Sequence, residues 1–165
     1  MRWLAARRRA VNALAAATCV ALLAYALYAE KVLGLEPCPL CMLQRAGVAA
    51  LGAAFLLAAA HHPRRLLGAR LYAALIFLVG LFPTAAAARH LYIQSQPAGT
   101  VPTCGATLEY MLEVFPLTEV LRKVFTGGGE CVRVDWQWLG ISMPGWVLVS
   151  VVALVTVGMV ANGRH

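Results

Sequence analysis

Charged residues are scarce in this chain of 165 residues: they make up 13%, only seven of them are acidic, and 61% of the residues are hydrophobic. Soluble domains are about a quarter charged and about half apolar. A single soluble core of this size could not bury so much apolar surface, which excludes an ordinary soluble globular protein. A lipid environment removes that difficulty, so we expect an integral membrane protein.

Acidic residues are absent from three stretches that carry arginine: the start of the chain, the connection at 61–70 and the C-terminus. The formal net charge of +7, taken alone, would be typical of a nucleic-acid-binding protein. The segregated charges instead follow the positive-inside pattern, which argues against a nucleic-acid partner and assigns both termini to the cytoplasm. The arginines are Arg2, Arg7, Arg8, Arg9, Arg64, Arg65, Arg70 and Arg164, and the acids are Glu30, Glu36, Glu109, Glu113, Glu119, Glu130 and Asp135.

Charges are also missing from the apolar segments, which predict an all-α membrane protein: a four-helix transmembrane bundle in a single domain, 1–165. The second segment reaches spanning length only if its helix begins at Pro39 or Leu40. Pro83 should kink the third helix, and Pro144 suits the first turn of the fourth. The predicted spans are 10–29, 40–60, 71–88 and 144–161, with periplasmic connections at 30–39 and 89–143.

The first apolar segment has a second interpretation, a cleaved signal peptide, because it follows arginines and has small residues at Ala24 and Ala26. Its apolar stretch is longer than such peptides usually carry. We therefore expect it to remain in the protein as the first helix of the bundle.

The long connection at 89–143 contains two apolar stripes with helical spacing, separated by Pro116. They predict two short amphipathic helices, with Thr107 as a candidate N-cap for the first. The periodicity fits helices on the membrane surface and helices packed on the bundle equally well. Glycines at 127–129 predict a flexible joint before Cys131. The stripes are Leu108, Met111, Leu112 and Phe115, then Leu117, Val120, Leu121 and Val124.

Cysteine is an infrequent residue here, with five in the chain. Cys19 falls in the middle of the first span, where a cysteine commonly serves as a small packing residue. The other four lie in the predicted periplasmic connections, where an oxidising environment lets disulfides persist. They are Cys38, Cys41, Cys104 and Cys131.

Cys38 and Cys41 form a Cys-x-x-Cys motif, a spacing that serves both redox couples and zinc sites. Pro39 fits the first position of a helix, which would put Cys38 at the N-cap and Cys41 in the first turn, beside amides that favour a thiolate. Arg45 lies four residues after Cys41 on the same helix face. Its charge would favour the thiolate further, unless it reaches for lipid headgroups instead. This context favours a redox pair.

A second Cys-x-x-Cys motif is missing, which weakens the zinc interpretation, because Cys104 and Cys131 would have to supply the remaining ligands. Among the histidines, only His90 falls near the periplasmic boundary, and we expect no metal. Cys104 and Cys131 fit either a structural disulfide that closes the loop or an exchangeable one in a mobile loop. Their spacing alone does not decide between the two.

These segments together resemble the DsbB family of membrane thiol oxidases. The resemblance lies in the run at 36–45, in the segment 89–92, in Cys104 and in the segment 131–146 with its tryptophans. It spans all four predicted helices in order and both cysteine pairs, a combination far more specific than Cys-x-x-Cys alone. The residues between Cys104 and Cys131 depart from the best-known member, which leaves the partner and the branch of the family open.

The resemblance implies an enzyme, a thiol:quinone oxidoreductase that oxidises a DsbA-like periplasmic thioredoxin-fold oxidase and so sustains disulfide formation in the periplasm. It implies the disulfides Cys38–Cys41 and Cys104–Cys131, with Cys104 forming the mixed disulfide with the partner. Cys38 would attack the loop pair through Cys131 and pass electrons inward. Cys41 would face the quinone, with Arg45 stabilising its thiolate and the reduced quinone.

The implied cofactor is ubiquinone or menaquinone, and the implied location is the bacterial inner membrane. His90 would lie near the quinone, and Met143 and Trp146 would line or border its pocket. Two other functions fit parts of the pattern. A thiolate metal-transfer protein predicts bound zinc or copper, and a non-catalytic scaffold predicts two disulfides that resist mild reductant.

Overall fold

The computed structural model describes residues 2–63, 65–97, 108–126 and 131–163. Over these ranges the chain is predominantly helical, and four of its helices are long and apolar enough to cross a membrane. The predicted all-α membrane bundle is therefore confirmed. The four long helices are α1 (Arg2–Lys31), α2 (Pro39–His61), α3 (Leu66–Gln94) and α6 (Met143–Gly163).

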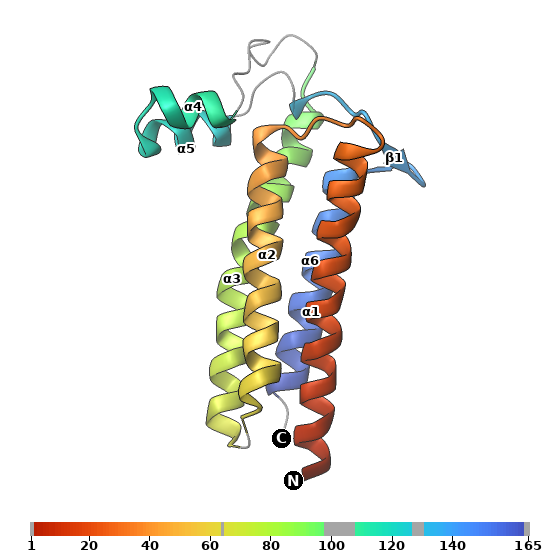
Figure 1. Cartoon of the computed structure of the whole chain (residues 1–165), viewed down its shortest axis with the longest axis vertical. Helices are drawn as coiled ribbons and strands as arrows, with labels where there is room; N and C mark the ends of the chain where they lie inside the picture. The colour runs from red at the N-terminus through yellow and green to blue at the C-terminus, as the bar shows by residue number, and fades with distance from the viewer. Residues whose placement is uncertain (1, 64, 98–107, 127–130, 164–165) are drawn as a thin grey trace.

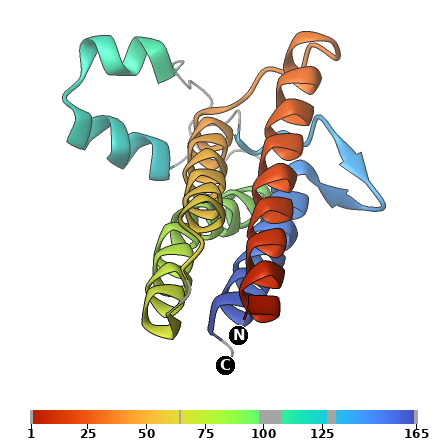
Figure 2. The same ribbon diagram turned by 60° about the horizontal axis from the view of Figure 1, so that its bottom comes forward.

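The long helices form a closed ring, in which α1 packs on α2, α2 on α3, α3 on α6 and α6 on α1 (Figures 1 and 2). The start of α1, the α2–α3 turn and the end of α6 lie together at one end of the bundle, here called the terminal end (Figure 1). The opposite end, where α2 begins after Cys38, is called the cysteine end.

Close contact between the helices depends on small residues facing large ones. Phe55 and Ile76 are fully buried in the middle of the bundle. A Cβ atom on Gly158 would lie 2.7 Å from the Phe55 ring and 3.0 Å from Ile76, so α6 can approach α2 and α3 only with glycine there. Likewise, a Cβ on Gly47 would lie 2.7 Å from Pro83. This small-residue packing is typical of membrane helices.

The outer surface of the bundle is apolar rather than polar. Leu14, Leu56 and Leu78 are 69%, 61% and 63% exposed, and all three belong to spanning helices. In water such a surface would drive association, whereas in a bilayer it contacts lipid chains. The exposed leucines and the buried glycines therefore point to the same environment.

The helices extend beyond the apolar runs, because intrahelical hydrogen bonding continues into more polar residues. α3 runs through Pro83 to Gln94, and the Ser95 amide donates to the Leu91 carbonyl at 3.1 Å. The helix therefore continues past residue 88, where the predicted span ends, and His90 lies on α3.

Two short helices, α4 (Leu108–Val114) and α5 (Leu117–Thr126), lie to one side of the cysteine end (Figures 1 and 2). Met111, Val120 and Val124 are buried in a cluster with Leu40 and Ile93 of the bundle. Their inner face therefore packs on the bundle, one of the two predicted arrangements. Leu112 and Leu117 from the same stripes remain exposed. The candidate cap Thr107 and the glycines at 127–129 lie outside the described residues.

A hairpin of β1 (Gln137–Trp138) and β2 (Ile141–Ser142) projects from the opposite side of this end (Figures 1 and 2). Its two turn residues, Leu139 and Gly140, have φ of 52° and 77°, as a two-residue hairpin turn requires. The Ser142 hydroxyl donates to Gln94 Oε1 at 2.8 Å. This bond ties the hairpin to the end of α3, next to the start of α6.

Candidate active site

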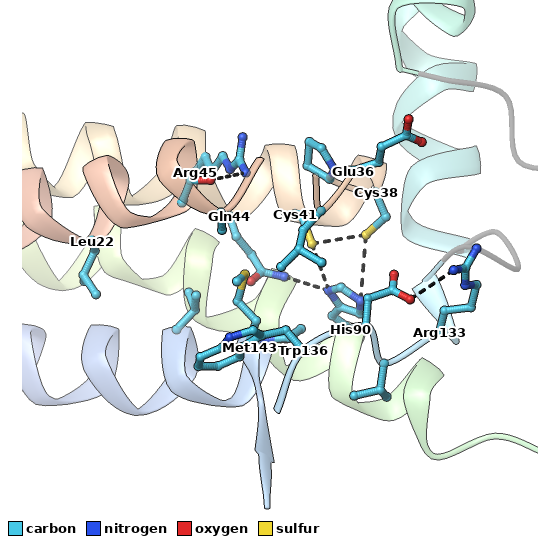
Figure 3. Close-up of a pocket in the computed structure, with 18 of the residues that line it drawn as sticks. Leu22, Glu36, Cys38, Cys41, Gln44, Arg45, His90, Arg133, Trp136 and Met143 are labelled. Carbon is cyan, nitrogen blue, oxygen red and sulfur yellow. Dashed lines mark hydrogen bonds and ion pairs between the residues drawn. The ribbon is translucent and has the colours of Figure 1, made fainter. Parts of the chain in front are cut away.

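The first turn of α2 presents two cysteines at the cysteine end (Figure 3). Cys38 is the N-cap residue, with extended backbone at φ −68° and ψ 163°, and a proline follows it as the sequence predicts. The Met42 amide donates to the Cys38 carbonyl at 3.1 Å and closes the turn. Unpaired amides at a helix start favour negative charge nearby.

The two sulfurs of the motif lie side by side. Cys38 Sγ is 3.3 Å from Cys41 Sγ. Cys38 is buried, at 7% exposure, whereas Cys41 is half-buried. The spacing is short enough for a disulfide to form with small side-chain rotations, which is the first requirement for a redox couple.

His90 of α3 lies against both sulfurs (Figure 3). Its Nε2 is 3.8 Å from Cys38 Sγ, and its Nδ1 is 3.9 Å from Cys41 Sγ. Gln44 contacts the same ring, with its amide nitrogen 3.1 Å from Nδ1. Because an amide nitrogen only donates, Nδ1 accepts, and the neutral ring carries its proton on Nε2. The imidazole N–H is thereby directed at Cys38.

Cys131 belongs to the same cluster. The ligand atoms of Cys38, His90 and Cys131 all lie within 4.8 Å of one another, and all three residues are buried. Cys131 is only 1% exposed and packs with Leu40 of α2. The structure therefore brings a loop cysteine next to the first cysteine of the motif. Cys104 lies outside the described residues, so its predicted pairing with Cys131 stays a prediction.

Arg45 turns towards α1 rather than towards the sulfurs. Its Nη1 forms an ion pair with Glu30, and its Nη2 donates to the Ala26 carbonyl at 3.0 Å. Its side chain is only 18% exposed, and the partner carboxylate offsets the cost of burying its charge. Arg45 still lines the same cavity as Cys41, as their shared helix face predicts.

A cavity of about 110 Å³ opens beside the cysteines. A water molecule needs roughly 10–15 Å³ on this measure, so the space accepts a group of several heavy atoms. Its wall is mostly apolar, and its polar lining residues include Gln44, Arg45 and His90. It is lined by Leu22, Leu23, Ala26, Ala29, Leu35, Glu36, Pro37, Cys38, Cys41, Gln44, Arg45, Val48, His90, Gln94, Arg133, Val134, Asp135, Trp136, Met143, Pro144 and Val147.

The two residues predicted at the pocket from the start of α6 have different places. Met143 lines the cavity, whereas Trp146 is not among the lining residues. The Trp146 indole donates to the Trp138 carbonyl at 3.2 Å, and the two rings are 5.0 Å apart. Trp136 lines the cavity instead and meets Tyr25 edge-on.

Sequence reasoning missed three members of this site: Gln44, Glu30 and Trp136. A signal existed for the first two, because a buried polar or charged side chain in a membrane helix is costly and usually has a function or a partner. Gln44 is 3% exposed and lies one turn after Cys41. Glu30 ends an apolar run at the same membrane level as Arg45. Nothing in the pattern distinguished Trp136 from the other tryptophans.

This arrangement is suited to thiol–disulfide exchange. Exchange needs a thiolate, a disulfide within reach and a group that stabilises the negative charge on the leaving sulfur. The helix start favours the thiolate, Cys131 lies beside Cys38, and His90 places an N–H near the sulfur. Every buried side-chain nitrogen and oxygen atom of the described residues has a hydrogen-bond partner, those of His90 and Gln44 included.

Comparison with known proteins agrees with this geometry. The family model described as "Disulfide bond formation protein DsbB" matches residues 8–161. Proteins named disulfide bond formation protein B are similar to the chain: one from Nitrosococcus oceani is 47% identical over 88% of this chain and 86% of its own length. One from Chromobacterium violaceum is 45% identical over 92% and 91%, and one from Hahella chejuensis is 48% identical over 82% of both. The chain belongs to the DsbB family of disulfide bond formation proteins.

Proposed function

We propose that this protein is a thiol:quinone oxidoreductase of the bacterial inner membrane, which reoxidises a DsbA-like dithiol oxidase in the periplasm and passes the electrons to a membrane quinone. The observation that carries the proposal is the position of the Cys38–Cys41 pair. It borders a largely apolar cavity at one end of a bundle of membrane length. A thiol pair there has access to a protein in water and to an oxidant dissolved in lipid.

Family membership supports the thiol-oxidising part of the proposal, since it gives the chain an oxidoreductase role in disulfide formation. The charge distribution supports the orientation. Arg7 and Arg8 lie in the first turns of α1 and Arg65 precedes α3 at the terminal end, whereas Glu30 and Asp135 lie at the cysteine end. By the positive-inside rule, the termini are then cytoplasmic and the cysteine end is periplasmic.

Electrons enter through the loop pair in this proposal. A partner thiolate attacks Cys104 of the Cys104–Cys131 disulfide and releases Cys131 as a thiolate. The second partner thiol then displaces Cys104, so the partner leaves oxidised and the loop pair is a dithiol. Two electrons have moved from the partner to the loop pair, and no outside oxidant is needed.

Two further exchanges move the electrons inward. The Cys131 thiolate attacks Cys38 of the Cys38–Cys41 disulfide, which forms a Cys38–Cys131 bond and releases Cys41 as a thiolate. The Cys104 thiolate then attacks Cys131, re-forms the loop disulfide and releases Cys38. The short separation of Cys131 from Cys38 supports this route. The direction of attack is the reverse of the expectation from the resemblance, because the electron pair travels with the attacking thiolate.

His90 and Gln44 assist the release of Cys38. His90 Nε2 lies 3.8 Å from Cys38 Sγ, and its N–H stabilises negative charge on that sulfur as it leaves. Gln44 keeps the proton on Nε2 by donating to Nδ1. Without this amide the ring could reverse its tautomer and present a lone pair to the leaving thiolate, which would repel it.

The cavity residues fit a quinone head group. Apolar side chains such as Leu22 and Val147 suit the ring, and Arg45 offers a cation for a ring oxygen that gains charge. Cys41 and Met143 border the same space. A bound quinone, either ubiquinone or menaquinone, would supply an acceptor for two electrons and two protons from the Cys38–Cys41 dithiol.

The test is a reconstituted assay. The full-length protein is placed in lipid nanodiscs with ubiquinone or menaquinone, and a reduced DsbA-like protein is added as the electron donor. Loss of the quinone absorbance measures turnover. We expect Cys41→Ala to fall to the background rate, whereas the matched control Cys19→Ala keeps the activity, because Cys19 is buried in the middle of the bundle among apolar side chains.

The donor and the acceptor are tested separately in the same assay. Turnover that persists in Cys41→Ala, or that does not depend on added quinone, would overturn the proposed route. A donor variant that lacks its second cysteine should stay attached to Cys104 as a mixed disulfide, because its single thiolate attacks the Cys104–Cys131 disulfide and releases Cys131, and no second partner thiol remains to displace Cys104. Peptide mapping of the trapped species identifies the bond, and a bond at any other cysteine contradicts the entry point.

A further inference from the structure

The cluster of Cys38, His90 and Cys131 has a donor set that its redox role does not require. It combines two thiols with an imidazole, buried and within 4.8 Å of one another. From this geometry we infer that the fully reduced protein binds a zinc ion, or a similar thiophilic divalent cation, through these three side chains. The bound ion withholds both thiolates from disulfide exchange, so the metal is an inhibitor specific for the reduced state.

The distances fit zinc. Tetrahedral zinc holds sulfur at about 2.3 Å and nitrogen at about 2.0 Å, which places neighbouring ligand atoms about 3.5–3.8 Å apart. Cys38 Sγ and His90 Nε2 are already 3.8 Å apart. The full set lies within 4.8 Å, so contraction by about an ångström completes the site. Side-chain rotation alone covers such a shift.

The surroundings also fit zinc. Zinc-bound histidines usually hold a hydrogen bond at the other ring nitrogen, and Gln44 occupies that position at Nδ1 of His90, 3.1 Å away. Ligation at Nε2 requires the ring proton to move to Nδ1. Rotation of the Gln44 amide then presents its oxygen to accept that proton, so one side chain supports both states of the ring.

A fourth ligand is within reach. Cys41 Sγ lies 3.3 Å from Cys38 Sγ and borders the cavity, although its 3.9 Å contact with His90 is to Nδ1, the nitrogen that does not ligate the ion; a water molecule in the cavity is the other candidate. The sequence argument against zinc was that no second close pair of ligands existed. The fold supplies the missing ligands from a loop and from α3, which sequence spacing does not reveal.

Metal binding depends on the redox state of Cys38 and Cys131. Each ion displaces the two thiol protons of Cys38 and Cys131, and no electrons are transferred. When either residue is in a disulfide, its sulfur is no longer a thiolate ligand, and the site is lost. Binding itself is independent of the proposed function, whereas the inhibition rests on it. The two parts therefore fail separately.

The experiment measures metal directly. Full-length protein in detergent is reduced with a phosphine, freed of reductant without oxygen, and titrated with Co²⁺ as an optical probe and with Zn²⁺ in competition. We expect one ion per reduced chain, with thiolate-to-cobalt absorbance, and no such absorbance for the oxidised chain. His90→Ala and Cys131→Ser should lose the absorbance. Gln44→Leu should bind about 10- to 100-fold more weakly, as loss of an outer-shell hydrogen bond does elsewhere.

Matched controls separate this site from adventitious binding. His61→Ala and Cys19→Ala should bind as the parent protein does, because His61 pairs with Tyr72 at the terminal end and Cys19 packs in the mid-bundle core. Equal binding by reduced and oxidised protein, or unchanged binding in His90→Ala, would overturn the inference. Circular dichroism verifies the fold of each variant. Zinc binding without inhibition of turnover would retain the site and reject its inhibitory role.

Discussion

The bundle contains buried polar side chains at both ends, and the two sets are built differently. At the terminal end, Asn12 of α1 and Asn162 of α6 exchange amide hydrogen bonds of 3.0 and 2.9 Å, and Asn162 also donates to the Gly158 carbonyl at 2.8 Å. At the cysteine end, the sulfurs of Cys38 and Cys41 meet His90 at 3.8 and 3.9 Å, beside a cavity.

The difference between the two ends distinguishes a structural asparagine pair from a reactive cysteine–histidine site. The asparagines are 1% and 0% exposed and bond to each other and to the backbone of α6, so the pair stabilises the α1–α6 contact. The sulfur contacts are longer, involve groups that change protonation or bonding, and face open space. Burial alone does not distinguish them: Cys19 is as buried as Cys131, at 1% exposure, yet has only apolar packing around it.

The largest effect on turnover, short of removing a cysteine, is expected from His90→Ala. Loss of a positioned proton donor typically costs 10²-fold or more, so we expect turnover to fall by about a hundredfold. The Cys38–Cys131 linked form should accumulate in a single turnover, because release of Cys38 is the step that His90 assists. Non-reducing peptide mapping measures that species. His61→Ala is the matched control, since this histidine bonds Tyr72 at 2.8 Å at the terminal end.

Arg45→Gln is expected to act on the quinone rather than on the thiols. We expect the KM for quinone to rise about tenfold, corresponding to about 1.4 kcal/mol, with the fold intact. Steady-state kinetics across quinone concentrations measure this change. Because Arg45 also forms an ion pair with Glu30, Glu30→Gln is the matched variant. If both substitutions shift the KM equally, Arg45 acts only through that pair, and its proposed contact with the quinone is wrong.

The sequence predicts the features that depend on local chemistry. Membrane thickness demands long apolar runs, so the four spans could be recognised without knowing their neighbours. The N-cap position of Cys38 follows from Pro39, whose fixed φ and missing amide suit the first helical position. The apolar stripes predicted α4 and α5 for the same reason, since helical periodicity needs no tertiary information.

The remaining features depend on how the helices are rotated about their axes. His90 meets Cys38 only because α3 packs on α2 with that face inward, and no spacing within either helix reveals it. Cys131 comes from a loop, and Asn12 is hydrogen-bonded to Asn162 although 150 positions separate them in the sequence. Such pairs can be suspected from a polar residue inside an apolar run, but their partners cannot be assigned.

The smallest expected effect concerns the asparagine pair. It tests whether this pair contributes to stability without contributing to turnover. Asn162→Leu leaves the Asn12 amide buried without its partner, and we expect a loss of about 1 kcal/mol in the free energy of unfolding, within the range measured between membrane helices. Quinone turnover should not change. The double variant Asn12→Leu with Asn162→Leu should be more stable than either single variant, because no unpaired amide remains. Thermal unfolding in detergent, read by circular dichroism, gives the double-mutant cycle. Additive losses would mean that the two amides do not depend on each other, and a loss of turnover in the single variant would mean that the terminal end is coupled to the reactive end.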